Sequence, residues 1–186
     1  MRSELILGGQ RSGKSRCAEA RASAWLAEPR HSAVLIATAL AGDDEMRARI
    51  TRHRADRARR VPRLESVEEP SRLAETLCRC SAPGRLVVVD CLSLWLTNLL
   101  MPLHGPALDE AAWLAVCDAL GSALDAAPGP VVLVSNEIGL GVSPLGSGTR
   151  RFVDELGRLH QAMAARCERV TLMVAGIEVP VKGPRP

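Results

Sequence analysis

The sequence predicts an α/β fold in which a mostly parallel β-sheet is flanked by helices. Three observations favour this class: short apolar runs, longer segments of helical periodicity between them, and a glycine-rich loop directly after the first run. The apolar runs are continuous rather than alternating, which is typical of strands that are covered on both faces. The expected strands are 5–7, 33–37, 86–89, 131–134 and 170–174.

Helical segments separate these strands, and the regular alternation predicts right-handed crossover connections. The expected helices are 14–27, 43–60, 71–80, 91–101, 108–126 and 149–166. The breaks rich in Pro and Gly, at 102–106 and 128–130, are short enough to be loops, so we expect one domain spanning residues 1–186. The tail Pro180–Pro186 is expected to be a frayed end.

Composition narrows the function classes. The 186 residues are 47% hydrophobic and 24% charged, the balance of a soluble globular protein. The first apolar run stops at Gly8, too early for a signal peptide or a membrane span, so we expect a cytoplasmic protein without stable membrane insertion. One Phe and no Tyr leave few platforms for stacking bases, so we expect no nucleic-acid partner. The six cysteines form no C-x-x-C pair and are interpreted as reduced.

The loop after the first strand satisfies the complete phosphate-loop pattern G-x-x-x-x-G-K-[ST]. Its residues are Gly8, Gly9, Gln10, Arg11, Ser12, Gly13, Lys14 and Ser15. A strand precedes it and a helix follows it, which is the setting in which backbone N–H groups and a helix N-terminus bind phosphates. Lys14 is expected to reach the β- and γ-phosphates. The pattern predicts a P-loop nucleotide-binding fold of the RecA-like kind and a phosphoryl-transfer enzyme.

A magnesium ion is expected beside this loop, held by the Ser15 hydroxyl and by Asp90 at the end of an apolar strand. Asp90 is also suited to cap the following helix, and the two roles are compatible. Glu137 follows another strand, in the polar segment Ser135–Glu137, and is a second candidate carboxylate. That segment has two open interpretations, an active-site loop and a plain turn.

His53 lies in a segment rich in arginine. Met46 and Ile50 share its helical face at i, i+4 and i+7, and the arginines around it are Arg49, Arg52, Arg54 and Arg57. One interpretation is a nucleophilic imidazole whose arginine neighbours neutralise a phosphate. The other is a surface histidine on a solvated basic helix, and composition alone favours this second one.

Several stretches together resemble one known family across nearly the whole chain. They are Gly8–Ser15, Ile36–Ala39, the E-M-x-x-R-I-x-x-H-R segment from Glu45 to Arg54, Glu68-Glu69-Pro70, Val89–Leu92, Leu96–Leu100, the S-N-E-x-G-x-G loop from Ser135 to Gly141, and Phe152–Arg158. These resemble the bifunctional adenosylcobinamide kinase / adenosylcobinamide-phosphate guanylyltransferase family of cobalamin biosynthesis. The resemblance departs at two positions, where the family usually has Trp for Leu64 and Asn for His160.

The resemblance implies two reactions. The first phosphorylates the aminopropanol hydroxyl of adenosylcobinamide with ATP or GTP, and the second transfers GMP from GTP to adenosylcobinamide phosphate through a guanylylated histidine, which by position is His53. It also implies a homotrimer. The nucleotide contacts that it implies are Gly8–Ser15, Thr38, Ala39, Leu40, Arg54, Glu68 and Asp90.

Two alternatives stay open. An ordinary P-loop small-molecule or nucleotide kinase would share Lys14 and Asp90 but would have no covalent histidine step. A nucleotide-dependent switch protein would hydrolyse slowly and would need no small hydroxyl substrate.

Overall fold

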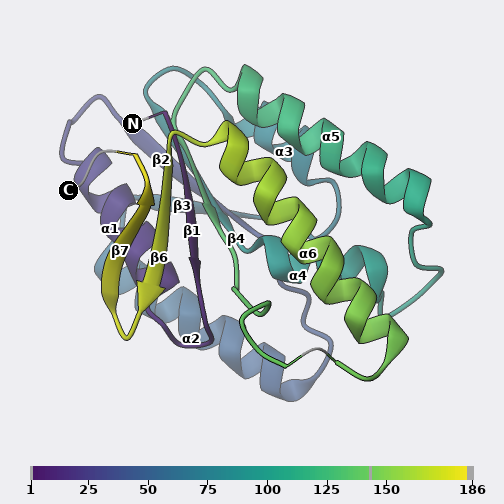
Figure 1. Cartoon of the computed structure of the whole chain (residues 1–186). Helices are drawn as coiled ribbons and strands as arrows, with labels where there is room; N and C mark the ends of the chain where they lie inside the picture. Colours follow the sequence, from purple (N-terminus) through teal and green to yellow (C-terminus); the bar gives the residue numbers. More distant parts are fainter. Residues whose placement is uncertain (1, 143, 184–186) are drawn as a thin grey trace.

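A seven-stranded sheet lies between two layers of helices in the computed structural model, which describes residues 2–142 and 144–183 (Figure 1). The strands run in the order β3-β2-β4-β5-β1-β6-β7, all parallel except β7, which is antiparallel to β6. They are β1 (Ser3–Gly8), β2 (Ser32–Ala37), β3 (Leu64–Glu68), β4 (Arg85–Asp90), β5 (Val131–Val134), β6 (Arg169–Val174) and β7 (Ile177–Lys182). The predicted fold class is therefore confirmed.

Each predicted helix is present, and its ends lie within two residues of the expected positions. The helices are α1 (Lys14–Trp25), α2 (Asp44–Arg60), α3 (Leu73–Cys80), α4 (Leu92–Leu100), α5 (Glu110–Ala126) and α6 (Ser147–Arg166). Aspartate caps explain two of the starts. Asp43 accepts a hydrogen bond from the backbone of Met46 at α2, and Asp109 accepts one from Ala112 at α5.

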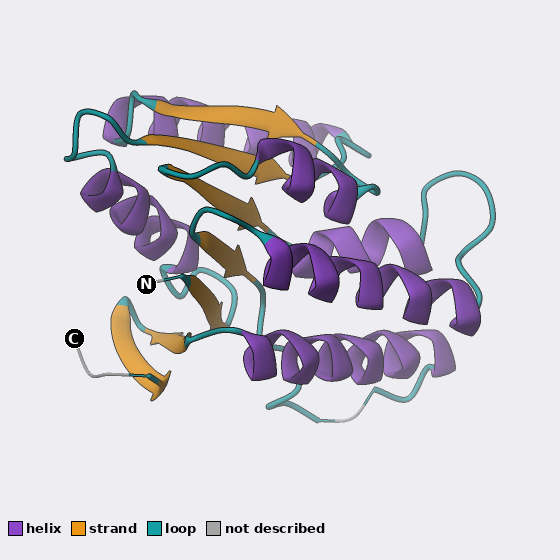
Figure 2. Cartoon of the chain, turned by 90° about the horizontal axis from the view of Figure 1, so that it is seen from above, coloured by secondary structure: helices purple, strands orange, loops and turns teal. Residues whose placement is uncertain are grey.

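The strands separate two apolar cores, because successive side chains point to opposite faces of the sheet. On β1, Leu5 packs into a core with α3, α4, α5 and α6, whereas Ile6 packs into a core with α1 and the end of α2. Figures 1 and 2 show these helices on opposite sides of the sheet. Leu5 and Ile6 are both fully buried, and such burial stabilises by about 1.5–3 kcal/mol per side chain.

The two edge strands, β3 and β7, were not predicted from the sequence. In β3 only Leu64 and Val67 are apolar, and Leu64 is buried in the core that contains Ile6, so the strand lacks the continuous apolar run of the inner strands. Edge strands are half covered, and their sequences therefore carry a weaker signal.

The prediction of a frayed end at Pro180–Pro186 is wrong for residues 180–182. These residues belong to β7, which folds back on β6 through a turn with left-handed backbone at Ala175 (φ 51°) and Gly176 (φ 82°). Thr171 pairs with Pro180 next to an irregularity in the register, which is where an edge strand tolerates proline. Residues 184–186 lie outside the described part of the chain.

In the part of the chain that the structure describes, no helix is both long and apolar enough to cross a bilayer. The parallel strands place the residues that follow β1, β2, β3, β4 and β5 along one edge of the sheet. In open α/β sheets this edge is where ligands bind.

Candidate nucleotide-binding site

The phosphate loop turns sharply between β1 and α1. Gly8 has φ 152°, and a Cβ atom there would lie 2.5 Å from the carbonyl oxygen of Met173, so only glycine fits. Gly13 has φ 102° and caps α1 without a side chain. The first N–H groups of α1 have no acceptor within the helix, which leaves them for an anion.

A cavity of about 690 Å³ opens beside this loop, within the size range of ligand pockets. Its walls come from the phosphate loop, α2 and the residues at the ends of β2, β3, β4 and β5. Of the expected site residues, those that line it are Gln10, Arg11, Ser12, Gly13, Lys14, Ser15, Ala39, His53, Arg54, Glu68 and Asp90. One cavity therefore brings together residues that are far apart in the sequence.

Gly8, Gly9, Thr38 and Leu40 do not line the cavity. Thr38 is fully buried, and its hydroxyl donates to the carbonyl oxygen of Cys91 at 2.7 Å and accepts from the Cys91 N–H at 2.9 Å. Its side chain joins the ends of β2 and β4. Leu40 lies next to the lining residue Ala39 and is 40% exposed.

Lys14 is buried at the base of the loop. Its ammonium group donates to the carbonyl oxygen of Gly9 at 2.6 Å. Burial lowers the pKa of Lys14, and the nearby negative groups, Asp90 among them, oppose the shift. An arriving phosphate would offer this ammonium group a second, charged partner.

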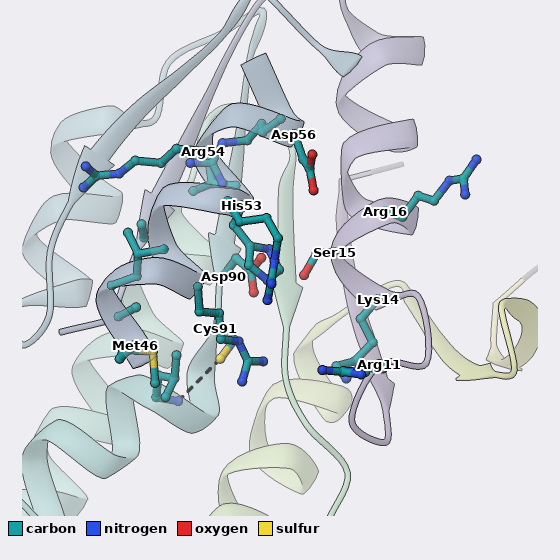
Figure 3. A pocket seen from close by; sticks show the side chains of 18 of the residues that line it. Arg11, Lys14, Ser15, Arg16, Met46, His53, Arg54, Asp56, Asp90 and Cys91 are labelled. Carbon is teal, nitrogen blue, oxygen red and sulfur yellow. Dashed lines mark hydrogen bonds between the residues drawn. The ribbon is translucent and has the colours of Figure 1, made fainter. Parts of the chain in front are cut away.

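Ser15 and Asp90 lie near each other in the cavity (Figure 3). Burial raises the pKa of Asp90 and outweighs the Ser15 hydroxyl and the charges of Arg57 and Lys14, which act to lower it. A hydroxyl and a carboxylate oxygen side by side fit Mg²⁺, which takes one or two protein carboxylates together with phosphate oxygens and water. The described residues hold no cluster of three or more His, Cys, Asp or Glu side chains suited to a metal.

His53 extends from α2 towards Ser15 and Asp90, whereas Arg54 extends away from them (Figure 3). Arg54 forms an ion pair with Glu68 at the end of β3. His53 is half-buried, so it lies on the cavity wall and not on a fully solvated face.

The cavity is strongly basic. Arg49, Arg52 and Arg57 all line it, and among the described residues none of the three has a carboxylate within ion-pair distance. Arg57 is only 8% exposed, and burial lowers its pKa. Its guanidinium donates to the Ser66 hydroxyl at 3.2 Å, which is a neutral partner. A buried cation without a counter-ion is costly, so the arrangement favours an anionic ligand.

Helix α2 also contacts the phosphate loop. When the Gln10 amide is oriented so that its oxygen faces α2, this oxygen accepts from both terminal nitrogens of Arg49 at 3.0 Å. This contact joins the phosphate loop to the helix that carries His53, and both of them line the cavity. The spacing of residues along the chain does not reveal this contact.

In the polar segment after β5, neighbouring residues differ in whether they line the cavity. Asn136 lines the cavity, but Glu137 does not. Glu137 instead lies 3.5 Å from His160 on α6, measured from Oε2 to Nδ1, and accepts from the backbone of Gly139 at 2.7 Å. The sequence pointed to the segment but not to Asn136 as its cavity-lining member.

Known proteins resemble this chain along nearly its whole length. The sequence model of the family described as cobinamide kinase / cobinamide phosphate guanyltransferase matches residues 4–181. The bifunctional adenosylcobalamin biosynthesis protein CobP of Pseudomonas aeruginosa is 52% identical, with 97% of each chain covered. The bifunctional adenosylcobalamin biosynthesis protein CobU of Escherichia coli is 36% identical, with 96% of this chain and 98% of that protein covered.

A solved structure supports the fold alone. The flagellar accessory protein FlaH of Methanocaldococcus jannaschii superposes with a TM-score of 0.53 at 9% identity, covering 98% of this chain and 78% of that one.

The chain has a complete phosphate loop, a histidine in the same basic cavity, and the CobP and CobU relatives along nearly its full length. It belongs to the cobinamide kinase / cobinamide phosphate guanyltransferase family.

Proposed function

We propose that the chain phosphorylates adenosylcobinamide and then transfers GMP from GTP to the phosphate it has made, through a guanylylated His53. The observation that carries the proposal is the presence of His53 and of the phosphate loop in one cavity. A kinase needs the loop alone, whereas a covalent nucleotidyl transfer also needs a nucleophile on the protein.

In the kinase step, the oxygen of the aminopropanol hydroxyl attacks the γ-phosphorus of ATP or GTP. The bond from that phosphorus to the β–γ bridging oxygen breaks, the nucleoside diphosphate leaves, and the hydroxyl proton passes to a base or to water. Lys14 and the N–H groups of the loop offset the charge on the phosphates. Mg²⁺ bound by Ser15 and Asp90 would supply further positive charge at the β- and γ-oxygens.

In the guanylyl step, an imidazole nitrogen of His53 attacks the α-phosphorus of GTP. A P–N bond forms and pyrophosphate leaves. The phosphate of the cobinamide substrate then attacks the same phosphorus, the P–N bond breaks, and the imidazole is regenerated. Arg49, Arg52 and Arg57 supply the positive charge that both pentavalent transition states require.

The remaining nucleotide contacts are also part of the proposal. Glu68, held by Arg54, and Ala39 lie at the wall of the cavity, where a base or ribose would extend from phosphates bound at the loop. Thr38 supports that wall through its hydrogen bonds with Cys91.

We also infer that the protein forms a homotrimer, which a measurement of its molar mass in solution tests.

The replacement His53→Ala tests the covalent step. The variant should retain no label from α-labelled GTP and should make no guanylylated product, yet should still phosphorylate adenosylcobinamide. Label on the unchanged protein should be released by acid and survive alkali, as a phosphoramidate does. His104→Ala, an exposed loop histidine, is the matched control and should label normally.

Label that persists on the His53→Ala variant would overturn the histidine assignment. If neither the variant nor the unchanged protein takes up label while phosphorylation proceeds, the chain is a P-loop kinase without a histidine step. If no cobinamide is phosphorylated by either protein, the proposed substrate is wrong.

A further inference from the structure

The geometry points to Asn136 as a further catalytic residue, whose side-chain amide donates to the terminal phosphate of the bound triphosphate, with His160 as its positioning residue. The inference deepens the proposed function and rests on it for the identity of the reaction. It begins from the Ser135–Glu137 segment, which the kinase and guanylyl steps described above do not use.

The segment runs between the two elements that bind phosphate. Strand β5 lies between β4, which ends in Asp90, and β1, which leads into the phosphate loop. Val134 pairs with Asp90 on one side and with Ile6 on the other. The residues that follow Val134 therefore emerge between the carboxylate and the loop.

Hydrogen bonds hold Asn136 at this place from both sides. Towards the phosphate loop, the Glu137 N–H donates to the carbonyl oxygen of Gly8 at 2.9 Å. Towards β4, the Asn136 N–H donates to the hydroxyl of Ser93 at 3.4 Å, and that hydroxyl lies 3.1 Å from the Cys91 sulfur. The backbone of Asn136 is thus held in place, and the residue lines the same cavity as Lys14 and Asp90.

The Asn136 amide is free to act on a ligand. Among the residues that the structure describes, the one hydrogen bond of Asn136 outside the sheet and helix ladders comes from its backbone N–H, and its side-chain amide makes none. An amide N–H₂ group can donate to a phosphate oxygen without adding charge, and the hydrogen-bonded backbone keeps this donor close to the cavity. A triphosphate whose β-phosphate occupies the loop extends its terminal phosphate towards Asp90 and therefore past Asn136.

His160 holds both neighbours of Asn136. Its ring is only 7% exposed, its Nε2 atom lies 2.8 Å from the hydroxyl of Ser135, and its Nδ1 atom lies 3.5 Å from the Glu137 carboxylate. A neutral ring satisfies both partners if Nδ1 carries the proton and Ser135 donates to Nε2. Burial favours that neutral form, since it lowers the pKa of His160 against the opposing charge of Glu137. His160 makes these contacts from α6, and no residue of α6 lines the cavity among those that the structure describes.

The test measures binding of two nucleotides without any corrinoid: a GTP analogue with a non-hydrolysable β–γ bridge, and GDP. Asn136→Ala should weaken binding of the analogue on the order of tenfold, the cost of one hydrogen bond to a charged group, and should change GDP binding by less than about twofold. Asn136→Asp should weaken the analogue further, because a carboxylate repels the phosphate. An equal loss for both nucleotides, or no loss for the analogue, overturns the inference.

The positioning role of His160 is tested by graded replacement. His160→Leu should show the same selective loss for the analogue, and His160→Asn, which keeps a donor towards Glu137, should recover part of it. Gln161→Ala, at an exposed neighbour on α6, is the control and should bind both nucleotides normally. If the two His160 variants lose analogue and GDP binding equally, the histidine is structural only and the positioning role is overturned.

These measurements stand apart from the proposed function. The binding measurements are made in the His53→Ala background, because the analogue keeps the α–β bond that His53 is proposed to attack. Discrimination between the analogue and GDP then needs neither cobinamide nor the His53 step. A protein that fails to guanylylate cobinamide phosphate, yet loses analogue binding selectively in Asn136→Ala, would refute the proposed reaction and leave the phosphate contact in place.

Discussion

Burial acts in opposite senses on the two charged residues at the base of the cavity. It lowers the pKa of Lys14 and raises the pKa of Asp90, because each charged form loses water. Each charge opposes the shift of the other, although burial has the larger effect on both pKa values. Removal of either residue therefore changes the site electrostatically as well as chemically.

Lys14→Ala should abolish both activities and preserve the fold. Among the residues that the structure describes, the ammonium group donates only to the Gly9 carbonyl, so its loss removes charge aimed at phosphates and little packing. We expect each turnover rate to fall roughly a hundredfold or more. Lys182→Ala is the matched control, because the second lysine lies on β7 and bonds to carbonyl oxygens at the end of α6. Turnover near the unchanged level in Lys14→Ala would contradict the role of the phosphate loop.

Asp90→Asn should weaken the dependence on magnesium. The amide keeps the size of the side chain but removes the charge that a hard cation needs. The measurement is a titration of kinase rate against Mg²⁺, in which the half-saturating concentration should rise. Asp109→Asn, at the exposed N-cap of α5, serves as control. An unchanged titration curve for Asp90→Asn would mean that another group binds the ion.

Residue roles were predictable where a local pattern determines them. The phosphate loop needs glycines at fixed positions between a strand and a helix, and Gly8 and Gly13 indeed have backbone angles that suit glycine. His53 could be placed in the site only through resemblance, since an arginine-rich helix is usually solvated. The position of Asn136 follows from the order of the strands, which no spacing along the chain reveals.

At the scale of elements, helices were more predictable than edge strands. Helix α2 has an aspartate cap, acidic residues in its first turn and arginines in its last, all readable from the sequence. No comparable sequence signal identifies strand β7. It is held by long-range contacts, in which Arg21 on α1 pairs with Glu178 on β7 and with Glu4 on β1.

Arg21→Ala should destabilise the fold strongly. Glu4 is fully buried, and its only other side-chain partner among the described residues is Thr171, so the variant leaves a buried carboxylate without a cation. The expected loss is about 3–5 kcal/mol in the free energy of unfolding, measured by urea denaturation. Arg30→Ala, which removes an exposed ion pair with Glu28, should change it by less than about 1 kcal/mol. Equal effects of the two replacements would show that the buried network is not stabilising.

At the scale of the whole molecule, the fold class followed from alternation, but the order of strands did not. Five apolar runs separated by helices predict a parallel sheet, and the inner strands β1, β2, β4, β5 and β6 are those runs. Their order depends on which strands pair across the molecule, as Leu5 does with Leu133 and Val170. The cavity forms only because this order brings Asp90 next to the phosphate loop.

Because the cavity is walled by α1, α2 and the ends of four strands, a bound nucleotide should stabilise the molecule as a unit. A ligand at a hundred times its dissociation constant stabilises the native state by about 2.7 kcal/mol. For a chain of this length that corresponds to a rise in Tm of roughly 5–11 °C, at about 2–4 °C per kcal/mol. Thermal unfolding with and without Mg²⁺ and GTP should show one transition that shifts as a whole. Lys14→Ala should lose most of the shift and Lys182→Ala should keep it, whereas a shift of the same size in both variants would mean that the nucleotide binds away from the phosphate loop.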